Sequence, residues 1–169
     1  HAAMCDRVVY YLKHEGSFIV NDIVLPQEEG SYTIGPIYHA HRIEQSGDNS
    51  YILSQPEVSM GPEMTHTQPD DVKLHLHFPM TEYGCEVQAI NRAYRDQMMV
   101  GQYFAGYTDH RSPLIFSSVL TPGQDTQPPF FDSFRTEKGP KGAGLQFTIG
   151  GKTYTLFDRY AYESKIEDL

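Results

Sequence analysis

Two His-x-His pairs carry the clearest chemical signal in this chain. They are His39 with His41, and His75 with His77. Alternate residues of a β-strand project to the same face, so each pair is expected to place two imidazoles side by side. Such pairs can begin a metal site or an acid–base site, and they are also compatible with solvated histidines on a half-buried strand.

Our first interpretation is acid–base chemistry in a cavity lined by His, Tyr and Arg. The candidate catalytic residues are His75, His77, Tyr38 and Arg42. The candidate ligand-binding residues are His39, His41, Tyr94, Tyr103 and Arg92. The imidazoles would transfer protons, while Tyr and Arg would stabilise developing negative charge. This interpretation predicts a small-molecule ligand or substrate, a lyase, isomerase or cyclase type of reaction, and no cofactor.

Two alternatives remain open. One is a non-catalytic β-sandwich module that binds carbohydrate or another protein, although sugar platforms often use Trp and this chain has none. The other is a metal-dependent enzyme, because the order of the 39–41 histidine pair, Glu44 and His66 resembles that of cupin barrels. Glu44 follows the pair more closely than in the usual cupin pattern, and the glycines fall elsewhere. We therefore predict no bound metal.

The two cysteines, Cys5 and Cys85, match neither a zinc cluster nor a Cys-x-x-Cys motif. They are compatible with one disulfide bond or with two free thiols. Cys85 follows Gly84 and would need a nearby base to act as a nucleophile, whereas a buried structural thiol is the commoner state.

Composition bounds the class of protein. The 169 residues include 13 basic and 22 acidic ones, for a net charge of −9, so the chain lacks the basic footprint of a nucleic-acid-binding protein. No apolar run is long enough to span a membrane, and no signal peptide is recognisable. The content of 39% hydrophobic and 21% charged residues indicates a folded globular protein, with homo-oligomerisation left open.

Alternating patterns predict the strands that must position these residues. The expected strands are 7–12, 17–25, 31–44 with a break at Gly35-Pro36, 51–54, 72–78, 113–120 and 130–135. One helix is expected over 86–100, where Val87, Ile90, Tyr94 and Met98 follow a 3.6-residue period. Alternation over 97–107 favours a strand there instead.

A hairpin over 145–156 is the sharpest local prediction. Gly150-Gly151 joins two alternating segments. The predicted apolar pairs are Phe147 with Tyr154 and Leu145 with Leu156, and the predicted polar pairs are Gln146 with Thr155 and Thr148 with Thr153. Together these patterns predict a mostly β fold: an antiparallel barrel or a two-sheet sandwich, in one domain over residues 5–169. Residues 1–4 are expected to be a tag or linker remnant; the alternative is a native His1, whose amine and imidazole could chelate copper.

Overall fold

All regular structure in the described residues is antiparallel β. The computed structural model describes residues 3–54, 73–79, 82–92, 95–109, 112–123, 131–139, 142–149 and 151–159. The strands are β1 (Ala3–Leu12), β2 (Ser17–Pro26), β3 (Gly30–Ile34), β4 (Ile37–Ala40), β5 (Arg42–Gly47), β6 (Ser50–Ser54), β7 (Lys73–His77), β8 (Gly84–Arg92), β9 (Arg95–Thr108), β10 (Leu114–Gly123), β11 (Phe131–Gly139), β12 (Gly142–Ile149) and β13 (Lys152–Arg159). Within these ranges there is no helix long and apolar enough to cross a membrane.

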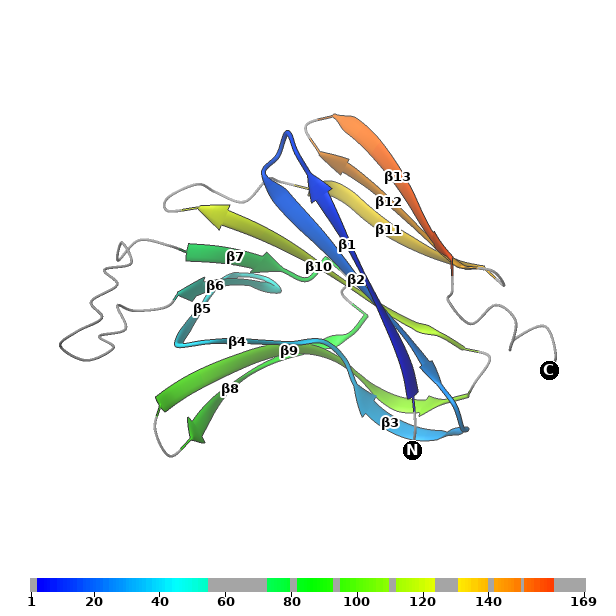
Figure 1. Cartoon of the computed structure of the whole chain (residues 1–169), viewed down its shortest axis with the longest axis horizontal. Coiled ribbons are helices and arrows are strands. Elements are labelled where there is room, and N and C mark those ends of the chain that lie inside the picture. Colours follow the sequence, from blue (N-terminus) through cyan, green and yellow to red (C-terminus); the bar gives the residue numbers. More distant parts are fainter. Residues whose placement is uncertain are drawn as a thin grey trace, which may run out of the picture.

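The strands form three sheets (Figure 1). A six-stranded sheet has the order β1-β2-β10-β7-β6-β5. A four-stranded sheet is built around the long strand β9. One edge of β9 pairs with β3 and, further along, with β4, and its other edge pairs with β8. A third sheet has the order β11-β12-β13. The sheets are open and pack face to face, so the sandwich is the observed one of the two predicted architectures.

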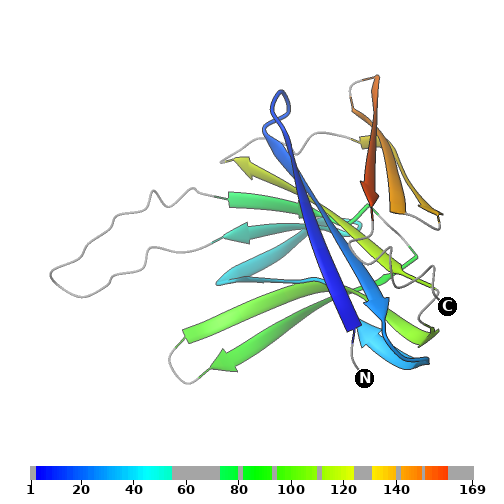
Figure 2. The same cartoon turned by 45° about the vertical axis from the view of Figure 1, so that its right-hand side comes forward.

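The main core lies between the six-stranded and four-stranded sheets. Alternate residues of the long strands supply it, as the period of a half-buried strand requires. One cluster contains Ile43, Tyr51, Leu53, Leu76, Phe78 and Val100, and a second contains Val24, Tyr83, Leu114 and Phe116. In Figure 2 the four-stranded sheet lies below the six-stranded sheet, and the β11-β12-β13 sheet lies beside β1 and β2.

The predicted hairpin over 145–156 is confirmed in every pair. Phe147 lies opposite Tyr154 and Leu145 opposite Leu156, and the two polar pairs also match. The rings of Phe147 and Tyr154 stack with centroids 5.2 Å apart. The apolar face of this hairpin packs on the opposite face of the six-stranded sheet, against Leu12, Ile19 and Val119.

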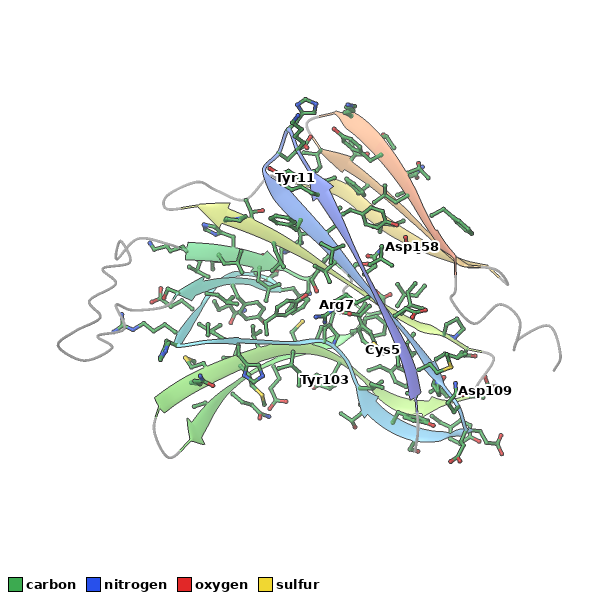
Figure 3. All side chains as sticks on the ribbon, viewed as in Figure 1. Cys5, Arg7, Tyr11, Tyr103, Asp109 and Asp158 are labelled. Atoms are coloured by element: carbon green, nitrogen blue, oxygen red, sulfur yellow. The ribbon has the colours of Figure 1, made fainter. Side chains whose placement is uncertain are left out.

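Buried polar groups also join this small sheet to the central one. The side-chain amide of Asn21 on β2 donates to a carboxylate oxygen of Asp158 on β13 at 2.9 Å, and the Ser117 hydroxyl on β10 donates to the side-chain oxygen Oδ1 of Asn21 at 2.8 Å. Figure 3 labels Asp158 on the side of β13 that faces the central sheet. A second link runs from the Tyr154 hydroxyl to the Glu15 carboxylate at 2.9 Å.

The helix predicted over 86–100 is wrong. The segment forms most of β8 and the start of β9, which pair antiparallel from Gly84 with Tyr103 to Arg92 with Arg95. β9 is hydrogen-bonded on both edges, and its even-numbered residues Val100 and Gln102 are 0% and 1% exposed. The backbone pairing of β9 on both edges and the burial of every second residue favour a strand. They outweigh the helical spacing of only four apolar residues.

The break predicted at Gly35-Pro36 is confirmed. β3 pairs with residues 104–108 of β9, and β4 pairs with residues 98–101 of the same edge. Between the two, the backbone N–H of Gln102 donates to the Pro36 carbonyl at 3.2 Å. The break at Gly35-Pro36 lets the chain continue along the same edge of β9, so β3 and β4 belong to one sheet.

Candidate functional site

His75 and His77 project from the face of the six-stranded sheet that lies away from the four-stranded sheet. Their neighbours on β7, Leu74 and Leu76, pack into the main core on the other face. His75 is paired with Ile52 and Thr121, whose side chains share its face. The prediction that His75 and His77 share one face of a strand is therefore confirmed.

The two imidazoles have different surroundings. Nδ1 of His77 lies 2.8 Å from the Ser50 hydroxyl oxygen, and that hydroxyl lies 3.1 Å from the Asp48 carbonyl that it donates to. Nε2 of His75 is buried and has no hydrogen-bond partner among the described residues. Burial lowers the pKa of His75, and Lys73 lowers it further. Burial also lowers the pKa of His77, partly offset by its hydrogen bond with the Asn49 backbone. The folded protein therefore favours the neutral form of both side chains, the form that accepts protons or metal ions, more than the unfolded chain does.

These lowered pKa values predict a pH-dependent stability. The folded protein binds fewer protons at these sites than the unfolded chain, so stability is complete above the unfolded pKa of about 6.5 and falls as the pH drops below it. We expect the double variant His75→Gln, His77→Gln to lose less stability than the original protein between about pH 7.5 and pH 5. Denaturant unfolding at both pH values measures this.

The Leu76→Ala variant is the control for that experiment, because it changes the same strand without a titrating group. It should be less stable at both pH values and keep the original pH dependence. An unchanged pH dependence in the double histidine variant would contradict the role given to the two side chains.

Tyr38 lies on the other side of the six-stranded sheet from these histidines. Its ring is in the main core, where it contacts Phe78 with centroids 6.1 Å apart. Its hydroxyl and that of Ser118 lie near each other, but neither forms a well-directed hydrogen bond within the described residues. Burial raises the pKa of Tyr38, and the neighbouring Ser118 offsets part of this. The hydroxyl therefore stays protonated at neutral pH.

An ion pair that the sequence analysis missed lies near this hydroxyl. Arg7 on β1 contacts Asp22 on β2 with Nε–Oδ1 and Nη2–Oδ2 distances of 2.6 and 3.0 Å. The Asp22 side chain is 4% exposed and that of Arg7 is 52% exposed. The signal was available, since a hairpin joining 7–12 to 17–25 places Arg7 opposite Asp22. Figure 3 shows Arg7 and Cys5 along β1, on a different sheet from Tyr103.

The other predicted site residues are dispersed. His39 is exposed on the outer face of β4, His41 lies between β4 and β5, and Arg42 is exposed on β5. Tyr94 and the side chain of Arg92, like His66, lie outside the described part of the structure. Those that are described do not line one cavity with His75 and His77. Among the described residues, no three His, Cys, Asp or Glu side chains are grouped to hold a metal ion.

Both cysteines are free thiols, so of the two alternatives left open by the sequence the structure has two free thiols and no disulfide between Cys5 and Cys85. Cys85 packs at the edge of the main core, with its sulfur 3.9 Å from the Gln102 amide nitrogen. Burial raises the pKa of the Cys85 thiol, with smaller opposing effects of Gln102 and Tyr51. A raised pKa disfavours the thiolate, and this environment is that of a structural cysteine.

The described part of the chain has a groove on the outer face of the four-stranded sheet. Its volume is about 470 Å³. It is lined by Thr33, Ile34, Gly35, Ile37, Glu86, Gln88, Met99, Gly101, Tyr103 and Ala105. Outward-facing residues of β9 form its floor and walls, because Val100 and Gln102 between them face the core. Of the residues selected from the sequence, Tyr103 lines the groove, and His39 lies beside it, opposite Met99.

Small residues create this groove. Gly101 stands between Met99 and Tyr103 on the outward face, and a Cβ there would lie 3.0 Å from the Pro36 carbonyl oxygen. The Tyr103 ring lies across Gly84 of β8, since a Cβ at Gly84 would come within 2.6 Å of that ring. The missing side chain at Gly101 thus leaves a depression. The missing side chain at Gly84 makes room for the Tyr103 ring, since an aromatic residue often covers a glycine on a neighbouring strand.

The polar side of the groove is ordered by a hydrogen bond. The Gln88 amide donates to Oε1 of Glu86 at 2.7 Å. Both side chains are exposed on the edge strand β8 and line the same groove as the Tyr103 ring, and Ile37 lies across Gly101 from Glu86. An aromatic face beside an oriented carboxylate and an amide is suited to binding a small polar ligand with an apolar side.

The groove could not be predicted from a helix over 86–100. In a helix over 86–100, Glu86 and Met99 would not share a face, whereas the paired strands place Glu86 opposite Gly101 and Gln88 opposite Met99. The signal that could have found it is the alternation of Met99, Gly101, Tyr103 and Ala105, which leaves one face of a strand with two large and two small residues.

Comparisons with solved structures show the same fold in part of a heparan sulfate lyase and of two heparinase III structures. Heparan sulfate lyase HepC from Pedobacter heparinus is 14% identical, with a TM-score of 0.60 over 92% of this chain and 24% of that one. A heparinase III, the BT4657 gene product, is 15% identical, with a TM-score of 0.62 over 94% of this chain and 24% of that one. A further heparinase III is 13% identical, with a TM-score of 0.62 over 92% and 23%. The chain therefore spans about a quarter of the length of these structures, and at this identity the likeness establishes the fold alone.

No protein-family model matches the sequence, and no curated protein matches it either.

Proposed function

We propose that this chain is a carbohydrate-binding β-sandwich module of a lyase-type protein, and that the groove on the four-stranded sheet holds the sugar. The observation that carries the proposal is the Tyr103 ring over Gly84 in the same groove that the hydrogen-bonded Glu86–Gln88 pair lines. Pyranose rings have an apolar face that stacks on aromatic rings and a rim of hydroxyls that bind carboxylates and amides. The groove presents both kinds of group on one exposed surface.

The structural neighbours support the carbohydrate class. Their names describe them as a heparan sulfate lyase and heparinases, and the similar part covers about a quarter of each. A module of that size within a larger enzyme can bind substrate without performing the cleavage. The proposal therefore assigns binding to this chain and leaves the reaction to the larger protein.

Tyr103→Ala tests the binding role. We expect the variant to bind oligosaccharides about fivefold to tenfold more weakly, the loss for one aromatic contact worth about 1–1.4 kcal/mol. Binding is measured by calorimetric titration of the full chain with a panel of neutral, amino and sulfated oligosaccharides.

Tyr107→Ala is the matched control. Tyr107 is on the same outward face of β9 and is 67% exposed, but it does not line the groove. It should leave the affinity unchanged. Equal losses in the two variants, or no binding of any oligosaccharide, would refute the groove as a sugar site.

A second candidate function is proton transfer by His75 and His77, as a lyase, isomerase or cyclase reaction would need. One observation favours it: both imidazoles have lowered pKa values, and Nε2 of His75 has no partner among the described residues. If this candidate holds, the full chain should release unsaturated sugar ends from an acidic polysaccharide, detected by ultraviolet absorbance. The double variant His75→Gln, His77→Gln should abolish that release.

A further inference from the structure

The groove contains one charged side chain among its described lining residues. That residue is Glu86, and no Lys or Arg accompanies it there. The whole chain carries a net charge of −9. A sulfated or carboxylated sugar in this groove would meet a carboxylate with no opposing cation, which costs free energy through like-charge repulsion. The groove therefore differs from a site for a polyanionic saccharide.

The Glu86 carboxylate is placed to receive a cation. The Gln88 amide holds Oε1 at 2.7 Å and so restricts the orientation of the carboxylate, while Oε2 takes no hydrogen bond from the described residues. The Tyr103 ring lies over Gly84, one position along the outward face of β8 from Glu86. An ammonium group between a carboxylate and an aromatic face gains both an ion pair and a cation–π contact.

From this geometry we infer that the groove binds saccharides with a free amino group, such as glucosamine units without an N-acetyl or N-sulfo substituent. The inference rests on the proposed function and names its ligand class. The sugar ring stacks on Tyr103, and its protonated amine lies against Glu86. N-acetylation removes the positive charge and N-sulfation reverses it, so either change removes the contact that selects the ligand.

The test compares three hexasaccharide probes on the full chain by calorimetric titration: a glucosamine hexamer, its fully N-acetylated form and a heparin hexasaccharide. At about pH 6 the glucosamine amines are protonated. We expect the glucosamine hexamer to bind about threefold to fivefold more tightly than the N-acetylated form, the effect of one exposed ion pair, and the heparin probe to bind weakest.

Glu86→Gln should remove the preference for the free amine, so that the glucosamine and N-acetylated hexamers bind the variant with equal affinity. Glu44→Gln is the matched control, because it removes the same charge from an exposed position on β5 of the other sheet. It should keep the preference. Equal unfolding midpoints of both variants exclude a loss of fold.

The failures of the two proposals are distinguishable. Equal affinities for the glucosamine and N-acetylated hexamers, both lowered by Tyr103→Ala, would overturn the amine selectivity and leave the sugar-binding groove in place. Tightest binding of the heparin probe, still dependent on Tyr103, would also overturn the selectivity alone. If no probe binds, or if binding does not depend on Tyr103, both proposals fall.

Discussion

Phe78→Ala is expected to lower the free energy of unfolding by about 3–5 kcal/mol, the cost of truncating a fully buried phenylalanine. Phe78 follows β7 and is 0% exposed. Its ring contacts those of Tyr38 and Tyr51, each with centroids 6.1 Å apart. Removing the ring leaves a cavity between the two large sheets, and two sheets held by their own backbone hydrogen bonds cannot close it fully.

Denaturant unfolding of the purified variant measures this loss. Phe157→Ala is the control, because Phe157 is on β13 and is 59% exposed. We expect that surface change to cost no more than roughly half a kcal/mol. A comparable loss in the two variants would show that Phe78 does not lie in the core between the sheets.

Gly35→Ala is expected to destabilise the protein by about 3 kcal/mol, at the upper end of the cost of overpacking. A Cβ at this position would overlap the Gln102 carbonyl oxygen, and that atom belongs to the backbone of β9. A flexible side chain could turn away from such an overlap, but a paired strand cannot. We expect β3 or β4 to separate from β9, and the groove that both strands border should be lost with them.

Thermal and denaturant unfolding of the Gly35→Ala variant tests this, with saccharide titration as a second measurement. Gly47→Ala is the matched control, since an added Cβ there makes only an ordinary contact of 3.7 Å with Ser50. Its stability should be close to that of the original chain. A stable Gly35→Ala variant would mean that the crossing from β3 to β4 does not approach β9 as closely as described.

The local strands could be predicted because their patterns are local. In β7 the alternation of Leu74 and Leu76 with His75 and His77 fixes which side chains face the core. In the hairpin from β12 to β13, the short Gly150-Gly151 connection sets the register, and every predicted pair is found. Both features depend on residues within about a dozen positions of each other.

The helix over 86–100 shows where local patterns fail. The spacing of Val87, Ile90 and Met98 fits a helix, yet each lies in β8 or β9. The deciding interactions are distant in sequence, because β9 is paired with β3 and β4 along its other edge. A window of fifteen residues contains no information about strands sixty residues away.

The sequence by itself determined the mostly β class, most strand positions, the faces of β7 and the hairpin register, because each follows from a period of two or from a short connection. The tertiary structure alone decided which of the selected residues meet. It separates Tyr38 from His75 and His77 by a whole sheet, and it assembles Tyr103, Glu86 and Gln88 into a groove. The physical reason is that a site is made of side chains from strands whose pairing depends on the burial of the complete sheets, and that burial is settled only when all the layers pack together.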